Sequence, residues 1–124
     1  MTLTVFSHAR VLDTLTGHAH ECFSVVVEGN RIREVSDRVS KLSGANEINV
    51  GGCTIMPGLI DVHIHVYATH LNQGATRDMP LTLMTTYALQ RMKGMLDRGF
   101  TTVRDAAGGD YGIRQAVEQG LCVG

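Results

Sequence analysis

The segment at residues 59–66 constrains the fold of this chain more than any other part of its sequence. It is almost continuously apolar, which is typical of a strand buried on both faces in a parallel sheet. Its polar residues, Asp61, His63 and His65, fall at alternate positions. Because side chains along a strand alternate between the two faces, these three groups are predicted to project to one side.

A repeated order of strand and helix follows this segment. Apolar spacing predicts a helix at residues 80–98, a strand at 101–105 and a second helix at 111–119. Such βα units indicate a parallel sheet. A (β/α)₈ barrel takes about 250 residues, so the chain is predicted to hold only the start of one. The methionines of the first helix lie at helical spacing and are predicted to pack in the core rather than bind a cofactor; they are Met84, Met92 and Met95.

The first 56 residues have a β pattern made of short segments. Strands are predicted at residues 3–6, 22–28 and 31–35, then at 47–50 and 53–56. Gly29 and Asn30 separate the second and third strands, and this pair predicts a two-residue hairpin loop. This half is predicted to be a small antiparallel sheet or sandwich.

Composition and charge exclude several classes of partner. The chain has 124 residues, 11 Lys plus Arg and 12 Asp plus Glu, without a run of like charges, so nucleic acid and anionic membrane surfaces are not expected partners. It has no leader-like N-terminus and no apolar stretch of membrane-spanning length, and we therefore expect a cytoplasmic protein. Cys22, Cys53 and Cys122 are odd in number and far apart, and they are predicted to be reduced and buried.

The alternation of Asp61, His63 and His65 predicts a metal-binding site. At the C-terminal end of a barrel strand, two neighbouring imidazoles suit a divalent metal, with Asp61 one layer deeper. A single such histidine is more often a hydrogen-bonded core residue, but burying three polar groups without partners costs a few kcal/mol apiece. His18 and His20 have the same spacing but flank the mouth of a hairpin, so we expect them to be exposed.

Residues 52–65, Gly-Cys-Thr-Ile-Met-Pro-Gly-Leu-Ile-Asp-Val-His-Ile-His, resemble the entry strand of the amidohydrolase superfamily. Residues 99–105 and the following Gly108-Gly109 resemble the second barrel strand in one of its branches. That branch holds imidazolonepropionase-related hydrolases and Xaa-Pro dipeptidase-like carboxypeptidases. The resemblance implies an α/β chain in which residues 1–56 are a small β-sandwich portion. Residues 57–124 would be the first two βα units of a truncated (β/α)₈ TIM-like barrel.

The resemblance also implies a binuclear metal hydrolase, usually with zinc, in which His63 and His65 hold the more buried ion. The superfamily completes its site with a carboxylated lysine, later histidines and an aspartate base. None of these can be assigned here, so the base is expected downstream of residue 124. The implied reaction is attack by a metal-activated hydroxide on a C–N bond of a small amide or peptide.

Other candidate site residues lie near the ends of the two predicted strands. Asp105 is expected either to face the site or to support the Gly108-Gly109 loop. Tyr67 and His70 lie in the long loop after the histidine pair, and such loops often contact substrate. The alternative function is a non-catalytic, truncated segment that folds or acts only with a missing C-terminal portion. The unfinished βα order disfavours a self-contained domain, and homo-oligomerisation stays open.

Overall fold

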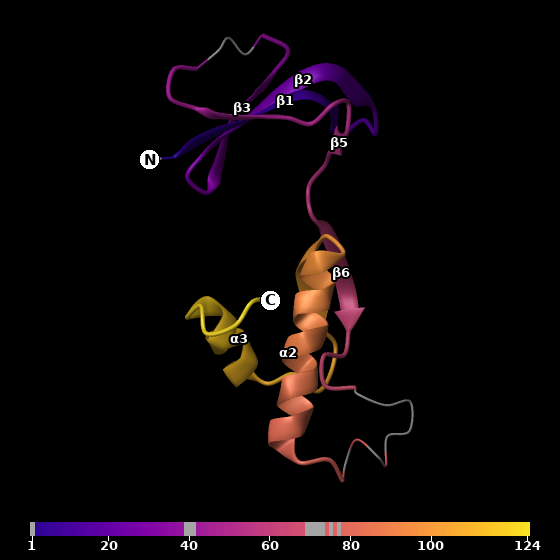
Figure 1. Ribbon diagram of the computed structural model, residues 1–124. Helices are drawn as coiled ribbons and strands as arrows, with labels where there is room; N and C mark the ends of the chain where they lie inside the picture. Colours follow the sequence, from indigo (N-terminus) through magenta and orange to yellow (C-terminus); the bar gives the residue numbers. More distant parts are fainter. Residues whose placement is uncertain (1, 39–41, 69–73, 75, 77) are drawn as a thin grey trace. The chain divides into compact units, whose positions relative to one another are not determined.

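The computed structural model of the chain describes residues 2–38, 42–68, 74, 76 and 78–124. The chain divides into two compact units, Met1–Pro57 and Gly58–Gly124, and Figure 1 colours the chain from indigo at the start of the first unit to yellow at the end of the second. The first unit consists of strands, and the second alternates strands and helices. The expected α/β class is confirmed at this level.

The first unit is one mixed sheet. Its strands are β1 (Leu3–Leu12), β2 (Ala19–Glu28), β3 (Arg31–Ser36), β4 (Asn46–Asn49) and β5 (Thr54–Ile55). The order is β3-β2-β1-β4, with β5 also paired to β1. β2 is antiparallel to both β1 and β3, whereas β4 and β5 run parallel to β1. The predicted antiparallel arrangement is confirmed for β1, β2 and β3 and is wrong for β4 and β5. The chain crosses to the free edge of β1 after β3, and turn residues in the sequence do not indicate such a crossover.

The predicted hairpin between β2 and β3 is confirmed. Glu28 pairs directly with Arg31, which leaves Gly29 and Asn30 as the loop. Gly29 has φ of 62°, a conformation that glycine adopts without a steric penalty. The hairpin signal in the sequence therefore identifies the connection correctly.

Strand β1 extends six residues beyond the predicted segment, to Leu12. Its additional buried positions are Ser7 and Ala9, whose small side chains give little hydrophobic signal. His8 and Cys22 have positive φ, 56° and 58°, and the β1–β2 register shifts between Phe6 and Ala9 and again before Val11. These irregularities are β-bulges, which bend a strand and disrupt its alternation.

The cysteines are free but mostly not buried. Cys22 and Cys53 are exposed and Cys122 is half-buried, so the predicted burial is wrong for the first two. Cys22 lies at a backbone irregularity of β2 with φ of 58°, and Cys53 lies in the turn before β5. Local backbone geometry places these side chains in solvent despite the general preference of cysteine for the interior.

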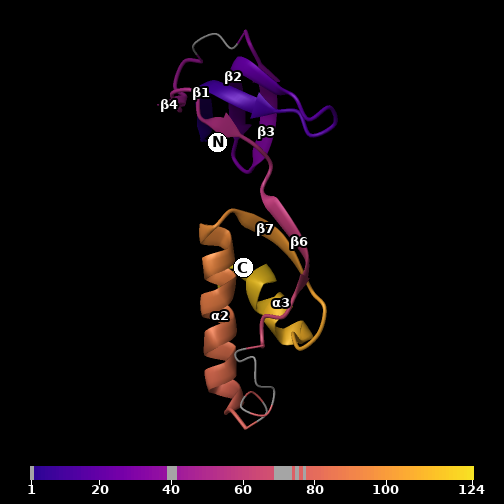
Figure 2. The same cartoon turned by 90° about the vertical axis from the view of Figure 1, so that its right-hand side faces the viewer.

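The second unit contains β6 (Leu59–Ile64), α2 (Leu81–Asp97), β7 (Phe100–Asp105) and α3 (Tyr111–Glu118). The two strands are parallel neighbours, and Figure 2 shows α2 running beside the pair. The predicted strand–helix–strand–helix order is confirmed. Strand β6 ends two residues before the predicted boundary. Within the described residues, no helix has the length and apolar character needed to cross a membrane.

The core of the second unit lies where the end of β6 meets α2. Buried Ile64, Val66 and Tyr67 pack with Ala88 and Met92. Met84 and Met95 pack against this cluster, which confirms the predicted packing role of the helix methionines. Earlier in β6, Ile60 and Val62 are 65% and 63% exposed, so within the described residues the only buried position of this strand is its last one, Ile64.

Candidate functional site

His63 and His65 lie side by side at the C-terminal end of β6. Their ring centroids are 5.2 Å apart, and the rings meet nearly edge to face at 80°. Both residues are exposed, whereas Ile64 between them is buried. The strand alternation therefore places both imidazoles opposite the face that packs on α2, as the sequence pattern indicates.

The ring of His65 is held in one tautomer. Its Nδ1 lies 2.9 Å from the carbonyl oxygen of Ala107, and a carbonyl oxygen can only accept a hydrogen bond. In the neutral ring Nδ1 therefore carries the proton, and Nε2 has the lone pair. This arrangement, a ring N–H donated to a backbone carbonyl, is the one that orients metal-ligating histidines.

Asp105 lies between the end of β6 and the loop after β7. Its carboxylate accepts from Val66 N at 3.4 Å and from Ala107 N at 3.0 Å. One carboxylate oxygen also lies 4.0 Å from Nδ1 of His65. The side chain is 21% exposed. Asp105 thus accepts hydrogen bonds from the loop after β7 and from the end of β6, and it lies beside His65.

A close approach in the same loop depends on glycine. A Cβ atom at Gly109 would lie 2.3 Å from Oδ2 of Asp105, which is closer than non-bonded atoms allow. The absence of a side chain at Gly109 therefore lets the carboxylate reach Val66. Gly109 thus has a steric role beside Asp105 and His65.

Asp61 has a local role. Its Oδ1 accepts a hydrogen bond from the backbone N–H of His63 at 3.0 Å, and its side chain is half-buried. The carboxylate therefore bends toward the backbone of its own strand. It stabilises the position of His63 through the main chain.

Tyr67 belongs to the core rather than to an exposed loop. It is 8% exposed, and its hydroxyl lies 3.4 Å from Oγ1 of Thr85 on α2. It also lines an open cavity of about 430 Å³ together with His65, Leu81 and Met84. Tyr67 is thus positioned as a wall of this mainly apolar cavity. The other predicted loop candidate, His70, lies outside the described residues.

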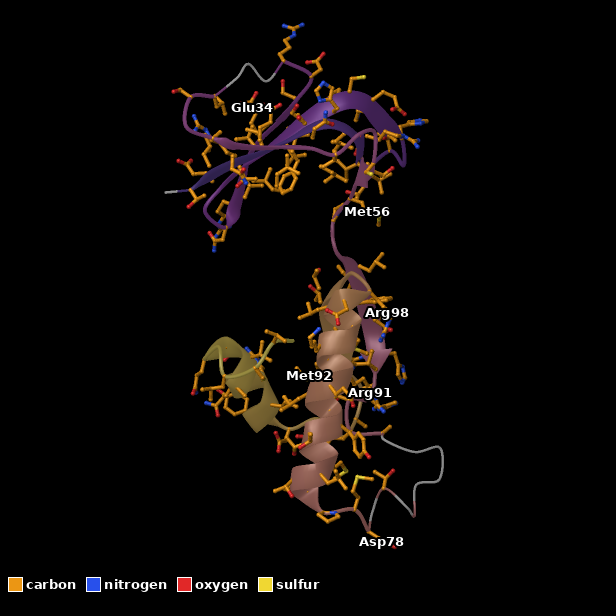
Figure 3. The ribbon with its side chains drawn as sticks, in the orientation of Figure 1. Glu34, Met56, Asp78, Arg91, Met92 and Arg98 are labelled. Atoms are coloured by element: carbon orange, nitrogen blue, oxygen red, sulfur yellow. The ribbon has the colours of Figure 1, made fainter. Side chains whose placement is uncertain are left out.

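Sequence reasoning missed Arg91 and the carbonyl of Ala107. Nη1 of Arg91 donates to the carbonyl oxygens of His65 and Val66, at 2.9 Å each. Figure 3 labels Arg91 on α2. An arginine on a helix gives no sequence signal that separates such a contact from a solvated surface charge, and a backbone carbonyl gives none at all.

The residues present fit part of a metal site. Two exposed neighbouring imidazoles, one with a fixed tautomer, suit a divalent ion such as zinc. Within the described part of the chain, however, no group of three or more His, Cys, Asp or Glu side chains is arranged to hold an ion. These residues therefore supply at most two protein ligands, fewer than a catalytic zinc site uses.

The other histidine pair is exposed, as predicted. His18 lies in the loop before β2, and His20 lies on that strand. The ring of His20 stacks on Phe23 at a centroid distance of 4.9 Å. This pair belongs to a solvent-facing turn.

Comparison with known proteins identifies the family. The model of the amidohydrolase family matches residues 54–124, more than half of the chain. The chain therefore belongs to the amidohydrolase family, and the resemblance predicted from its motifs is confirmed.

Individual relatives match only part of their own length. A prolidase crystallised with N-methylphosphonate-L-proline superposes with a TM-score of 0.92 and 46% identity, over 99% of this chain and 30% of that chain. A dihydroorotase from Syntrophotalea carbinolica is 39% identical over 62 residues, which are 50% of this chain and 14% of the relative. An imidazolonepropionase from Vibrio cholerae is 28% identical over 116 residues and is matched over 28% of its length. This chain thus spans less than a third of each of these three relatives.

Proposed function

We propose that this chain is the N-terminal part of a metal-dependent amidohydrolase that cleaves a C–N bond in a small amide or peptide. The observation that carries the proposal is the histidine pair, with rings 5.2 Å apart and Nδ1 of His65 committed to a carbonyl. Family membership supports it, as do the prolidase and dihydroorotase relatives. The substrate would be a small molecule, and the cytoplasm is the compartment we propose.

The proposed fold of the complete protein follows from the same pattern. The first unit would be a β-sandwich portion, and β6–α2–β7–α3 would be the first two βα units of a (β/α)₈ barrel. The parallel pairing of β6 with β7 supports this. So does the exposure of Ile60 and Val62, because barrel strands bury such side chains against neighbouring elements.

In this proposal His63 and His65 contribute two ligands to one ion of a binuclear, zinc-type centre. The ion supplies Lewis-acid chemistry, which polarises the substrate carbonyl and makes water nucleophilic near neutral pH. The Ala107 carbonyl accepts from the ring of His65, and Asp105 accepts from the following N–H of Val66, so both would help to hold this side chain with Nε2 available to an ion. Tyr67 and Met84 offer an apolar wall beside His65 to a substrate side chain. The remaining ligands and the catalytic base would come from residues beyond 124.

The test uses the complete reading frame that contains these residues. The purified protein should contain a divalent metal by elemental analysis. It should hydrolyse at least one member of a panel of Xaa-Pro dipeptides, N-acyl amino acids and cyclic amides such as dihydroorotate. A chelator should abolish this activity, and zinc should restore it. A metal-free protein that is inactive on the whole panel would contradict the proposal.

A second candidate is a non-catalytic segment that acts only with a separate C-terminal portion. The limit of two ligands among the described residues favours it. The discriminating experiment assays the 124-residue chain alone and then mixed with the C-terminal portion. We expect the isolated chain to be catalytically inactive in either case. Activity that appears on mixing would favour a segment that acts with a separate C-terminal portion.

A further inference from the structure

Arg91, a half-buried residue of α2, binds the backbone at the end of β6. Its Nη1 donates to two successive backbone carbonyls, those of His65 and Val66, at 2.9 Å each. These carbonyls follow directly after the last residue of β6, Ile64, whose own carbonyl accepts from Ala106 N. Arg91 therefore binds the chain just where the ladder between β6 and β7 ends.

The helix holds Arg91 firmly in this position. Ala88 and Met92, on either side of Arg91 in the sequence, are buried in the core cluster of the second unit. Hydrogen bonds from a charged donor are about twice as strong as neutral ones. The packed helix thus fixes the position of the guanidinium, and the guanidinium in turn holds the backbone carbonyl of His65.

The backbone and ring of His65 are then fixed from several directions. Arg91 donates to its carbonyl, which also accepts from Ala68 N at 3.2 Å. Asp105 accepts from the next backbone N–H, that of Val66, and Ala107 accepts from the ring. Arg91 is the member of this set that comes from the helix rather than from the strand ends.

We propose that Arg91 is a positioning residue for the candidate metal ligand His65. It sets the backbone from which the imidazole projects, and it acts without touching the ion or the substrate. The inference rests on the proposed function, because it requires His65 to bind the metal. Loss of partners that orient a ligand typically lowers metal affinity 10–100-fold, and we expect this range for Arg91.

The experiment measures Zn²⁺ affinity of the complete protein, prepared metal-free, by competition with a chromophoric chelator. The variants are Arg91→Met, Arg91→Lys and the matched control Arg98→Met, which changes an exposed arginine at the end of the same helix (Figure 3). Arg91→Met should weaken Zn²⁺ binding 10–100-fold. Arg91→Lys should recover part of this loss, because an ammonium can also donate to two carbonyls. Arg98→Met should bind like the unaltered protein.

The measurement separates positioning from simple stabilisation. Affinity is determined well below the unfolding midpoint, so a purely structural role would lower that midpoint and leave the affinity unchanged. Unchanged affinity in a folded Arg91→Met protein would overturn the proposal, and so would an equal loss in Arg98→Met. If Arg91→Met does not fold, Arg91→Gln, whose shorter side chain does not place its amide nitrogen at the position of Nη1, is judged by the same criterion. Normal Zn²⁺ binding after His63→Ala and His65→Ala would instead refute the proposed metal site itself.

Discussion

The chain contains two His-x-His segments with the same spacing, but the surroundings of their side chains differ. His63 and His65 lie at the end of β6, where the residues that follow each of them, Ile64 and Val66, are buried, and their rings pack edge to face. His18 and His20 lie at an exposed turn, where His20 stacks on Phe23 instead. The spacing alone therefore predicts little about chemistry.

The difference between the pairs lies in what surrounds each ring. Nδ1 of His65 donates to Ala107, and Asp105 and Arg91 hold the adjacent backbone. A ligand whose ring and main chain are already fixed loses little conformational entropy when it binds an ion. Support from neighbouring strands and helices thus distinguishes a candidate ligand from a surface histidine.

Replacement of both histidines in each pair is the change with the largest expected effect. In the complete protein, His63→Ala with His65→Ala should remove at least one bound ion together with nearly all hydrolysis, because two ligands of that ion are lost. The matched double variant, His18→Ala with His20→Ala, should keep both properties. Elemental analysis and a turnover assay on the two variants measure the contrast. Unchanged metal content in the His63 and His65 double variant would show that these two histidines do not bind the metal.

A pair of glycine substitutions tests the support of each histidine pair. Gly109→Ala forces the new Cβ against Oδ2 of Asp105 and should cost roughly 1–3 kcal/mol through lost hydrogen bonds. It should also weaken Zn²⁺ binding about tenfold. Gly17→Ala meets no neighbouring atoms but has φ of 75°, so it should cost about 1 kcal/mol through backbone strain.

Urea unfolding and chelator competition on both variants provide the measurements. We expect both substitutions to lower stability, whereas only Gly109→Ala should change metal affinity. Equal Zn²⁺ affinity in the two variants would show that the loop beside Asp105 does not support His65.

The smallest expected effect is the pH response of the turn that carries His18. The Thr16 hydroxyl, and then the Leu15 N–H, hold the pKa of Asp13 below its ordinary value. Because the folded pKa is lowered, this contribution is fully present above the ordinary aspartate pKa of about 3.9. It is lost as the pH falls through the folded value.

Carbon-13 NMR titration of the Asp13 carboxyl checks this prediction. Its midpoint should lie below that of Asp13 in an unfolded peptide, and Asp13→Asn should remove the associated acid sensitivity of the turn. A midpoint at or above the peptide value would contradict the assignment.

Much of the local structure follows from patterns of neighbouring residues. The Gly29-Asn30 loop, the helix methionines and the projection of His63 and His65 to one side follow from turn chemistry, the 3.6-residue helical period and strand alternation. These signals depend on side chains close in sequence. In β1 the buried residues Ser7 and Ala9 are small, and the pattern therefore predicts an end at residue 6, whereas the strand continues to Leu12.

Contacts between distant segments were decided by the tertiary structure alone. The parallel pairing of β4 and β5 with β1, the burial of Tyr67 and the contact of Arg91 with the His65 carbonyl each join segments with no shared local signal. A backbone carbonyl such as that of Ala107 is present at every residue, so its role depends only on what the fold brings near it. The sequence by itself determined which residues offer imidazoles on one side of a strand. Long-range packing decided how His65 is held, because the groups that bind its ring and its carbonyl, Ala107 and Arg91, lie 42 and 26 residues away along the chain.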